Sequence, residues 1–207
     1  MKLSTRDLLV EVLLDAFDKE APAETVRARM AALVEQFPSE QAEVADKLTR
    51  YIGALEEWRV APPGAALPGA ALPGAALPCA APQLSARDTA LSKAALLFNH
   101  HLFFEVHEVL EAQWREEHDP ARLFLQGLIQ VAVAFHHLER RNFRGAVALL
   151  HDGLEKIMPA RPAFLGVELQ EFVARLIACH SELQRLGPEH YDQFQSTRIP
   201  RLQFHVG

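Results

Sequence analysis

The sequence has few of the features that identify a function directly. Its two cysteines, Cys79 and Cys179, lie far apart and have neither metal-binding nor redox spacing, so free thiols of a cytoplasmic protein are expected. No apolar run approaches the roughly 20 residues that a membrane span needs. Acidic residues interrupt the apolar N-terminal stretch, which is unlike a signal peptide. We therefore expect a cytoplasmic protein with no membrane partner.

An excess of basic side chains is also missing. The chain has 27 acidic and 21 basic residues and a net charge of −6, which argues against a protein that coats nucleic acid. Arg140, Arg141 and Arg144 form one small basic group, and this is more typical of a solvated turn than of a phosphate site. The hydrophobic content of 49% matches an ordinary globular protein, and 207 residues provide for one or two domains.

A change of composition at residues 61–84 predicts the domain organisation. This segment has no charged residue and contains three consecutive GAALP copies at 64–78, whose regularly spaced prolines exclude a continuous helix. We interpret 61–84 as an Ala/Pro/Gly linker. It separates an N-terminal helical region, 1–60, from a helical domain, 85–207, which begins with Ser85 and Asp88 as capping partners.

The spacing of apolar residues predicts an all-α fold. In the domain 85–207 we expect about five helices: two helical hairpins followed by a C-terminal helix. Turns are predicted at 100–102 and 141–142, and the last helix is predicted to span 164–186 and to end at Gly187-Pro188. The remaining tail is predicted to be irregular. The region 1–60 is expected to form a small three-helix unit.

The stretch 103–114, FFEVHEVLEAQW, contains the most informative polar residues. At about 100° per residue, His107 and Glu111 fall together within the apolar stripe of a helix, and Glu108 lies on its flank. Glu105 is expected to point away. Because a buried charge must be paired or neutralised, His107 and Glu111 predict either a buried hydrogen-bond network or a ligand site.

The following helix adds further polar candidates. Gln126, Gln130 and His137 are spaced four and seven residues apart and share one face. Adjacent residues face different ways on a helix, so at most one of His136 and His137 joins this face, and the geometry favours His137.

These two stretches resemble a known family. The pattern FN-x4-FEVHEVLEAQW, followed by LFLQGLIQVAVAFHHLERRNFRGAVALL, is similar to the bacterial and archaeal domain of unknown function 309. The resemblance implies an all-helical protein of the bacterial cytosol, favours His136 over His137, and implies no established activity. The family usually has Gly where this chain has His101. The resemblance covers about a quarter of the chain. The matching positions are Phe98, Asn99, Phe104, Glu105, His107, Glu108, Glu111, Trp114, Gln126, Gly127, Gln130, Ala132, His136, Asn142, Gly145 and Ala146.

Two classes of function follow from these residues. The first is an interaction or ligand-binding module with a buried polar network formed by His107, Glu108, Glu111, Gln126, Gln130, His136 and His137. The second is a metal-binding protein or hydrolase-like enzyme, because His and Glu at i, i+4 suit zinc or another transition ion. Di-iron bundles use two Glu-x-x-His motifs, and neither these nor an HExxH motif is present. A site open to solvent favours the second class.

The sequence leaves several points open. It identifies no substrate, no cofactor and no protein or small-molecule partner, and it leaves open both enzymatic activity and a homo-oligomer.

Overall fold

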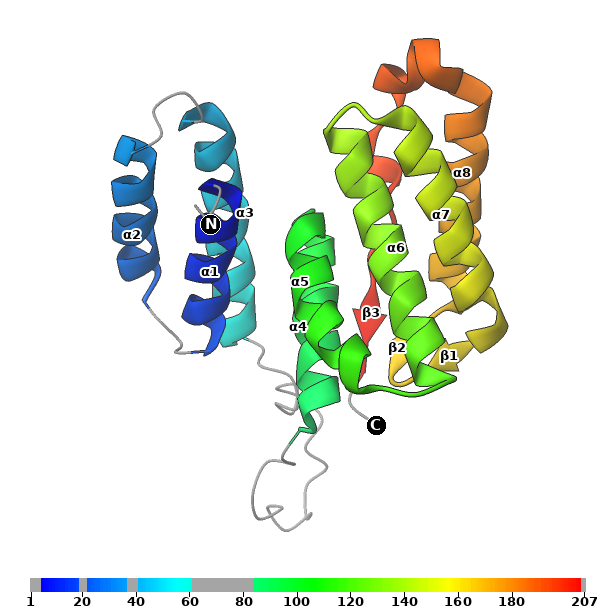
Figure 1. Ribbon diagram of the computed structural model, residues 1–207, viewed down its shortest axis with the longest axis horizontal. Helices are drawn as coiled ribbons and strands as arrows, with labels where there is room; N and C mark the ends of the chain where they lie inside the picture. The colour runs from blue at the N-terminus through cyan, green and yellow to red at the C-terminus, as the bar shows by residue number, and fades with distance from the viewer. Residues whose placement is uncertain (1–4, 19–21, 37–40, 61–83, 206–207) are drawn as a thin grey trace, which may run out of the picture. The chain divides into compact units, whose positions relative to one another are not determined.

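The computed structural model describes residues 5–18, 22–36, 41–60 and 84–205. It divides into two compact units, one holding Met1–Leu77 with His100–Leu102 and the other holding Pro78–Asn99 with Phe103–Gly207. The described residues form eight α-helices and only three very short strands, so the predicted all-α class is confirmed (Figure 1). The GAALP repeats and Cys79 lie outside the described residues. The predicted domain boundaries stay predictions.

The first unit contains three helices. Neighbouring helices pack together, and Leu13 and Met30 are fully buried between them. Arg29 forms an ion pair with Asp15 at 2.6 Å, which links the second helix to the first. The helices are α1 (Thr5–Asp18), α2 (Ala23–Gln36) and α3 (Gln41–Val60).

The second unit contains five helices, as predicted. Each of these helices packs against the next helix in the chain (Figure 1), and a short hairpin lies between α7 and α8 in the sequence. The first four form the two predicted hairpins, with turns at 100–102 and 140–142. The helices are α4 (Ala86–Asn99), α5 (Phe103–Glu116), α6 (Ala121–Glu139), α7 (Phe143–Ile157) and α8 (Gln170–His190).

Side-chain caps fix where two of these helices begin. The Ser85 hydroxyl accepts a hydrogen bond from the Asp88 backbone N–H at 3.1 Å, which confirms the predicted capping pair. The Asn142 side chain accepts one from the Gly145 N–H at 3.0 Å and starts α7. Arg141, immediately before, has a positive φ of 58°, which turns the chain between α6 and α7.

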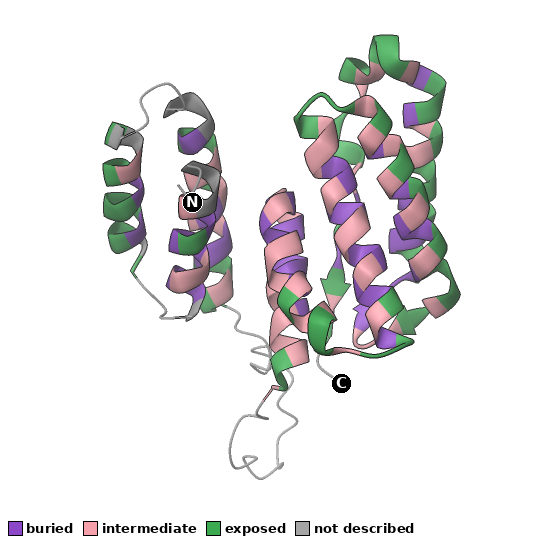
Figure 2. Cartoon of the chain, viewed as in Figure 1, coloured by how far each residue is buried: buried purple, intermediate pink, exposed green. Residues whose placement is uncertain are grey.

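An aromatic cluster forms the centre of the second unit. The ring of Phe98 on α4 meets Phe103 of α5, Phe135 of α6 and Phe172 of α8 edge to face, at centroid distances of 5.3, 6.0 and 5.5 Å. Such pairs stabilise a core beyond the burial of their area. One side chain thus ties four helices together. Figure 2 shows the buried residues along the helix faces.

Glycines bring α6 and α7 close together. A Cβ atom added to Gly127 would lie 2.6 Å from Cγ2 of Ile157, and one added to Gly153 would lie 2.8 Å from Cγ2 of Val131. The carbonyl oxygen of each glycine also lies within 3.1 Å of the other's added Cβ. The two helices therefore cross where neither has a side chain.

The structure corrects the predicted start of the last helix. Residues 163–168, expected to enter that helix at 164, form a hairpin whose strands β1 (Ala163–Phe164) and β2 (Val167–Glu168) are antiparallel. Leu165 and Gly166 both have positive φ, which makes a tight hairpin turn and prevents a helix here. The tail is not wholly irregular, because β3 (Gln203–Phe204) pairs with β2. The predicted break at Gly187 is confirmed by its φ of 68° inside α8.

Candidate functional site

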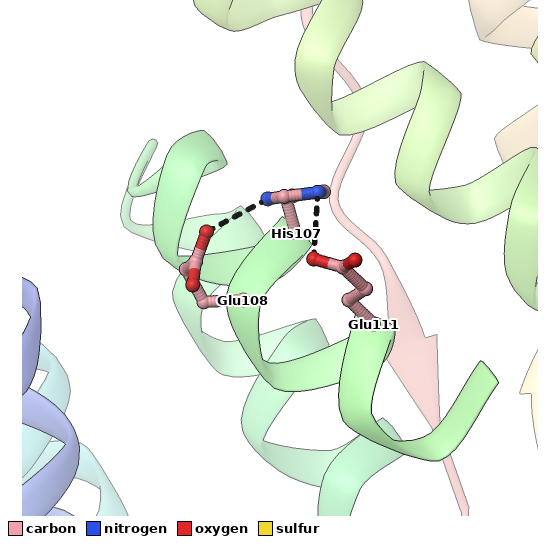
Figure 3. Close-up of side chains that lie close together, drawn as sticks. All are labelled: His107, Glu108 and Glu111. Carbon is pink, nitrogen blue, oxygen red and sulfur yellow. Dashed lines mark hydrogen bonds and ion pairs between the residues drawn. The ribbon is translucent and has the colours of Figure 1, made fainter. Parts of the chain in front are cut away.

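The strongest candidate site lies on α5 and contains His107, Glu108 and Glu111. The His107 imidazole lies between the two carboxyl groups, which approach opposite ring nitrogens (Figure 3). Nδ1 is 3.0 Å from Oε1 of Glu108, and Nε2 is 3.3 Å from Oε2 of Glu111. One ligand atom from each residue lies within 4.8 Å of the other two. The structure thus brings together three of the seven residues that the sequence singled out as a polar network or ligand site.

Solvent reaches all three side chains. Their exposed fractions are 28% for His107, 37% for Glu108 and 30% for Glu111. The expected burial of this network is therefore wrong. The face of α5 that packs most closely is centred on Phe103 and Leu110, so that His107 lies at the edge of the packed face rather than in its middle.

Glu105 is the one buried charged residue of the part of the chain that the structure describes, with 1% of its surface exposed. Helical periodicity predicted that Glu105 points away from the core, and the structure corrects this prediction. A single apolar stripe does not describe α5, because the helix packs against both α4 and α6.

Of the two adjacent histidines, the structure brings His136 towards α5. The Phe104 ring of α5 lies 5.5 Å from the His136 ring and 5.8 Å from the His107 ring, so it stands beside both. His137 instead contacts Asn142 at the turn between α6 and α7, through Nδ1 and Nδ2 at 3.0 Å. The position of His136 agrees with the resemblance rather than with the helical-wheel argument.

The two glutamines lie half-buried on α6. The Oε1 atom of Gln130 is buried and has no hydrogen-bond partner, and the Nε1 atom of Trp114 on α5 is in the same state. Buried polar atoms of this kind usually have partners, so these two require an explanation. The Arg122 guanidinium covers the Trp114 ring at 4.1 Å.

A second cluster was missed by the sequence analysis. His151, Asp152 and Glu155 on α7 also bring one ligand atom each within 4.8 Å. Its signal in the sequence is the spacing His-acid-x-Leu-Glu, which is shared with 107–111. The side chains of His151 and Glu155 are 59% and 67% exposed, so this cluster is much more open than the one on α5.

Sequence comparisons concern the helical region that contains this cluster. Residues 91–149 match the family described as "Domain of unknown function (DUF309)". The chain is also similar to "Uncharacterized protein YpuF" of Bacillus subtilis (strain 168), with 30% identity over 95 residues that cover 45% of this chain and 49% of the relative. The chain thus spans about half the length of the curated relative it matches. No solved structure matches.

Among the described residues, no helix is both long and apolar enough to span a bilayer.

Proposed function

We propose that the second unit is a ligand-binding helical module that takes a divalent first-row metal ion at His107 and Glu111. The observation that carries the proposal is the position of the His107 ring between two carboxylates. A neutral imidazole has one N–H and one lone pair, so it donates to only one carboxylate. The other carboxylate then faces a lone pair, unless a second proton or a metal ion lies between them.

Glu108 has the geometry of an orienting residue. Metal-bound histidines usually donate their second ring N–H to a carboxylate or carbonyl, which fixes the tautomer. Glu108 Oε1 lies 3.0 Å from Nδ1 of His107 and accepts such a hydrogen bond. The Nε2 lone pair is then directed towards Glu111.

The distance between the two ligand atoms also suits a metal. Zinc binds histidine nitrogen and carboxylate oxygen at about 2.0–2.2 Å, and tetrahedral geometry then separates two such ligands by roughly 3.4 Å. Nε2 of His107 and Oε2 of Glu111 are 3.3 Å apart. The pair therefore needs little rearrangement to bind an ion, and the remaining coordination positions stay open to water or to a substrate.

A purely structural network is the second candidate. Arg115 donates to the other carboxylate oxygen of Glu111, Oε1, at 2.6 Å, so Glu111 has a partner without a metal. All four side chains belong to one helix, where pairs at i, i+4 add only a few tenths of a kcal/mol (about 0.2–0.5). This reading accounts for the contacts and gives them no function beyond holding the side chains in place.

We also propose that the protein acts in the bacterial cytosol, because the family resemblance implies this location.

Metal titration of the full chain separates the two candidates. Isothermal titration with Zn²⁺, and the absorption bands of Co²⁺, measure affinity and coordination directly. We expect His107→Gln and Glu111→Gln each to weaken Zn²⁺ binding at least about tenfold, and Glu108→Gln to weaken it by about 10- to 100-fold, as loss of an orienting partner does.

His151→Gln is the matched control, because it alters the similarly spaced cluster on α7. This variant should leave Zn²⁺ binding at His107 and Glu111 unchanged. Zn²⁺ binding that is unchanged by His107→Gln, or lost only in His151→Gln, would overturn the proposed site.

A further inference from the structure

A cavity of about 450 Å³ lies in the second unit, away from the residues of the α5 cluster. It is bounded by the start of α6, the end of α7 and strand β1. This volume is in the range of small-molecule sites, which are mostly apolar with a few placed polar groups. Its apolar lining consists of Pro120, Leu123, Phe124, Pro159, Ala160 and Phe164.

The floor and the mouth of this cavity differ in exposure. Phe124 is only 2% exposed and meets Phe164 edge to face, with ring centroids 5.1 Å apart. Leu123 is 46% exposed, and Met158, next to the lining residue Pro159, is 37% exposed. Apolar surface left in water is unfavourable, and an apolar ligand removes it from water.

The charged residues that line the cavity indicate which charge a ligand there would carry. Lys156 and Glu155 are the two charged residues that line the cavity. Glu155 Oε1 lies 3.5 Å from Nε2 of His151 one turn earlier on α7, so its carboxylate already has a partner. The Lys156 ammonium donates one hydrogen bond, to the Asp152 carbonyl at 3.3 Å, and retains further N–H groups.

We propose that this cavity binds an anionic amphiphile: a carboxylate with an unbranched apolar chain. The chain lies against Phe124 and Phe164, and the carboxylate accepts a hydrogen bond from Lys156. A charge-assisted hydrogen bond of this kind is stronger than one between neutral groups. The inference uses none of the α5 cluster and stands independently of metal binding.

Decanoate, used below its micelle concentration with the full chain, is the probe. Its affinity is measured by calorimetry, and amide chemical-shift changes show where it binds. Decanol tests the need for the charge, and acetate tests the need for the chain. We expect decanoate to bind more tightly than decanol, acetate not to bind, and the shift changes to centre on Leu123 and Phe164.

Two variants with matched controls test the residues. Lys156→Gln should lower decanoate affinity by about three- to tenfold and leave decanol affinity unchanged. Arg144→Gln, an exposed cation on the same helix, should change neither. Leu123→Gln should weaken both ligands, and Ile177→Gln, which alters a comparably exposed apolar residue on α8, should weaken neither.

Any of three affinity results would overturn the proposal. These are no decanoate binding, equal affinity for decanoate and decanol in the unaltered chain, or equal losses in Leu123→Gln and Ile177→Gln. Amide chemical-shift changes that decanoate causes on another surface, such as one that would accept an apolar peptide, would likewise show that decanoate does not bind in this cavity.

Discussion

Nε2 of His107 and Oε2 of Glu111 lie 3.3 Å apart across one turn of α5, in side chains that are 28% and 30% exposed. Because solvent screens partly exposed pairs, the contact itself contributes little to stability, about 0.2–1 kcal/mol. This is less than the sequence suggested, since a fully buried pair would cost about 1–3 kcal/mol when one partner is removed. The contact therefore contributes little to the stability of the fold.

The first prediction concerns the coupling between these two residues. In metal-free buffer, a double-mutant cycle of His107→Ala and Glu111→Ala should give a coupling free energy of unfolding below about 1 kcal/mol. With Zn²⁺ at about 100 times its Kd, the unaltered protein gains roughly 2.7 kcal/mol, whereas a single variant that binds Zn²⁺ about a hundredfold more weakly gains only about 0.4 kcal/mol, so the coupling rises. Urea unfolding with and without Zn²⁺ measures both values. A coupling that Zn²⁺ leaves unchanged contradicts the prediction.

The second prediction concerns Glu105, which is 1% exposed. Replacing a buried, partnered carboxylate leaves its partner unsatisfied, so Glu105→Ala should lower the free energy of unfolding by about 1–3 kcal/mol. Glu116→Ala, at the exposed end of the same helix, is the control and should change it by less than about 0.5 kcal/mol. Equal thermal midpoints for the two variants would show that the burial of Glu105 has no energetic consequence.

Glu105 and His107 also show which parts of the structure the sequence could predict. Helical periodicity is strong over tens of residues, and it predicted α4 to α7 and their turns. It predicts less well which way one helix is rotated, because α5 packs against two neighbours and buries more than one face. The rotation of α6 about its own axis is equally hard to predict. Helical spacing therefore favoured His137, although it is His136 that lies beside Phe104.

The hairpin at 163–168 was missed for a different reason. Each of its strands has two residues, which is too short for an alternating pattern to be seen. Its pairing with β3 joins residues far apart in the sequence. Only Gly166 gave a local signal, and a single glycine is consistent with many kinds of turn.

The third prediction concerns the crossing of α6 and α7. Alanine favours a helix over glycine by about 1 kcal/mol, so Gly153→Ala would stabilise an isolated helix. Here the added Cβ would lie 2.8 Å from Val131 Cγ2 and 2.9 Å from the Gly127 carbonyl oxygen, which forces the helices apart. We expect Gly127→Ala and Gly153→Ala each to destabilise the protein by about 1–3 kcal/mol. Arg144→Ala, exposed on α7, is the control, and stabilisation by either glycine variant would contradict the close crossing.

The last prediction concerns the pH dependence of stability through His180. Burial, and then the nearby charge of His151, lower the pKa of His180 below its usual 6.5, and a hydrogen bond to the Val147 backbone opposes this only in part. The two rings stack at 5.8 Å, and Nε2 of His180 is buried without a partner, so a proton added there would have no acceptor.

The sign of the effect follows from this lowered pKa. At a pH below about 6.5 the unfolded chain binds a proton at His180 more readily than the folded protein does, so the free energy of unfolding falls as the pH is lowered through this range. His180→Gln should make this fall shallower, and His190→Gln, exposed on the same helix, should not. His151→Gln should also reduce the slope, because it removes the repelling charge. Urea midpoints measured across this range decide the matter, and parallel curves for the unaltered chain and His180→Gln would exclude His180 as a source of the acid sensitivity.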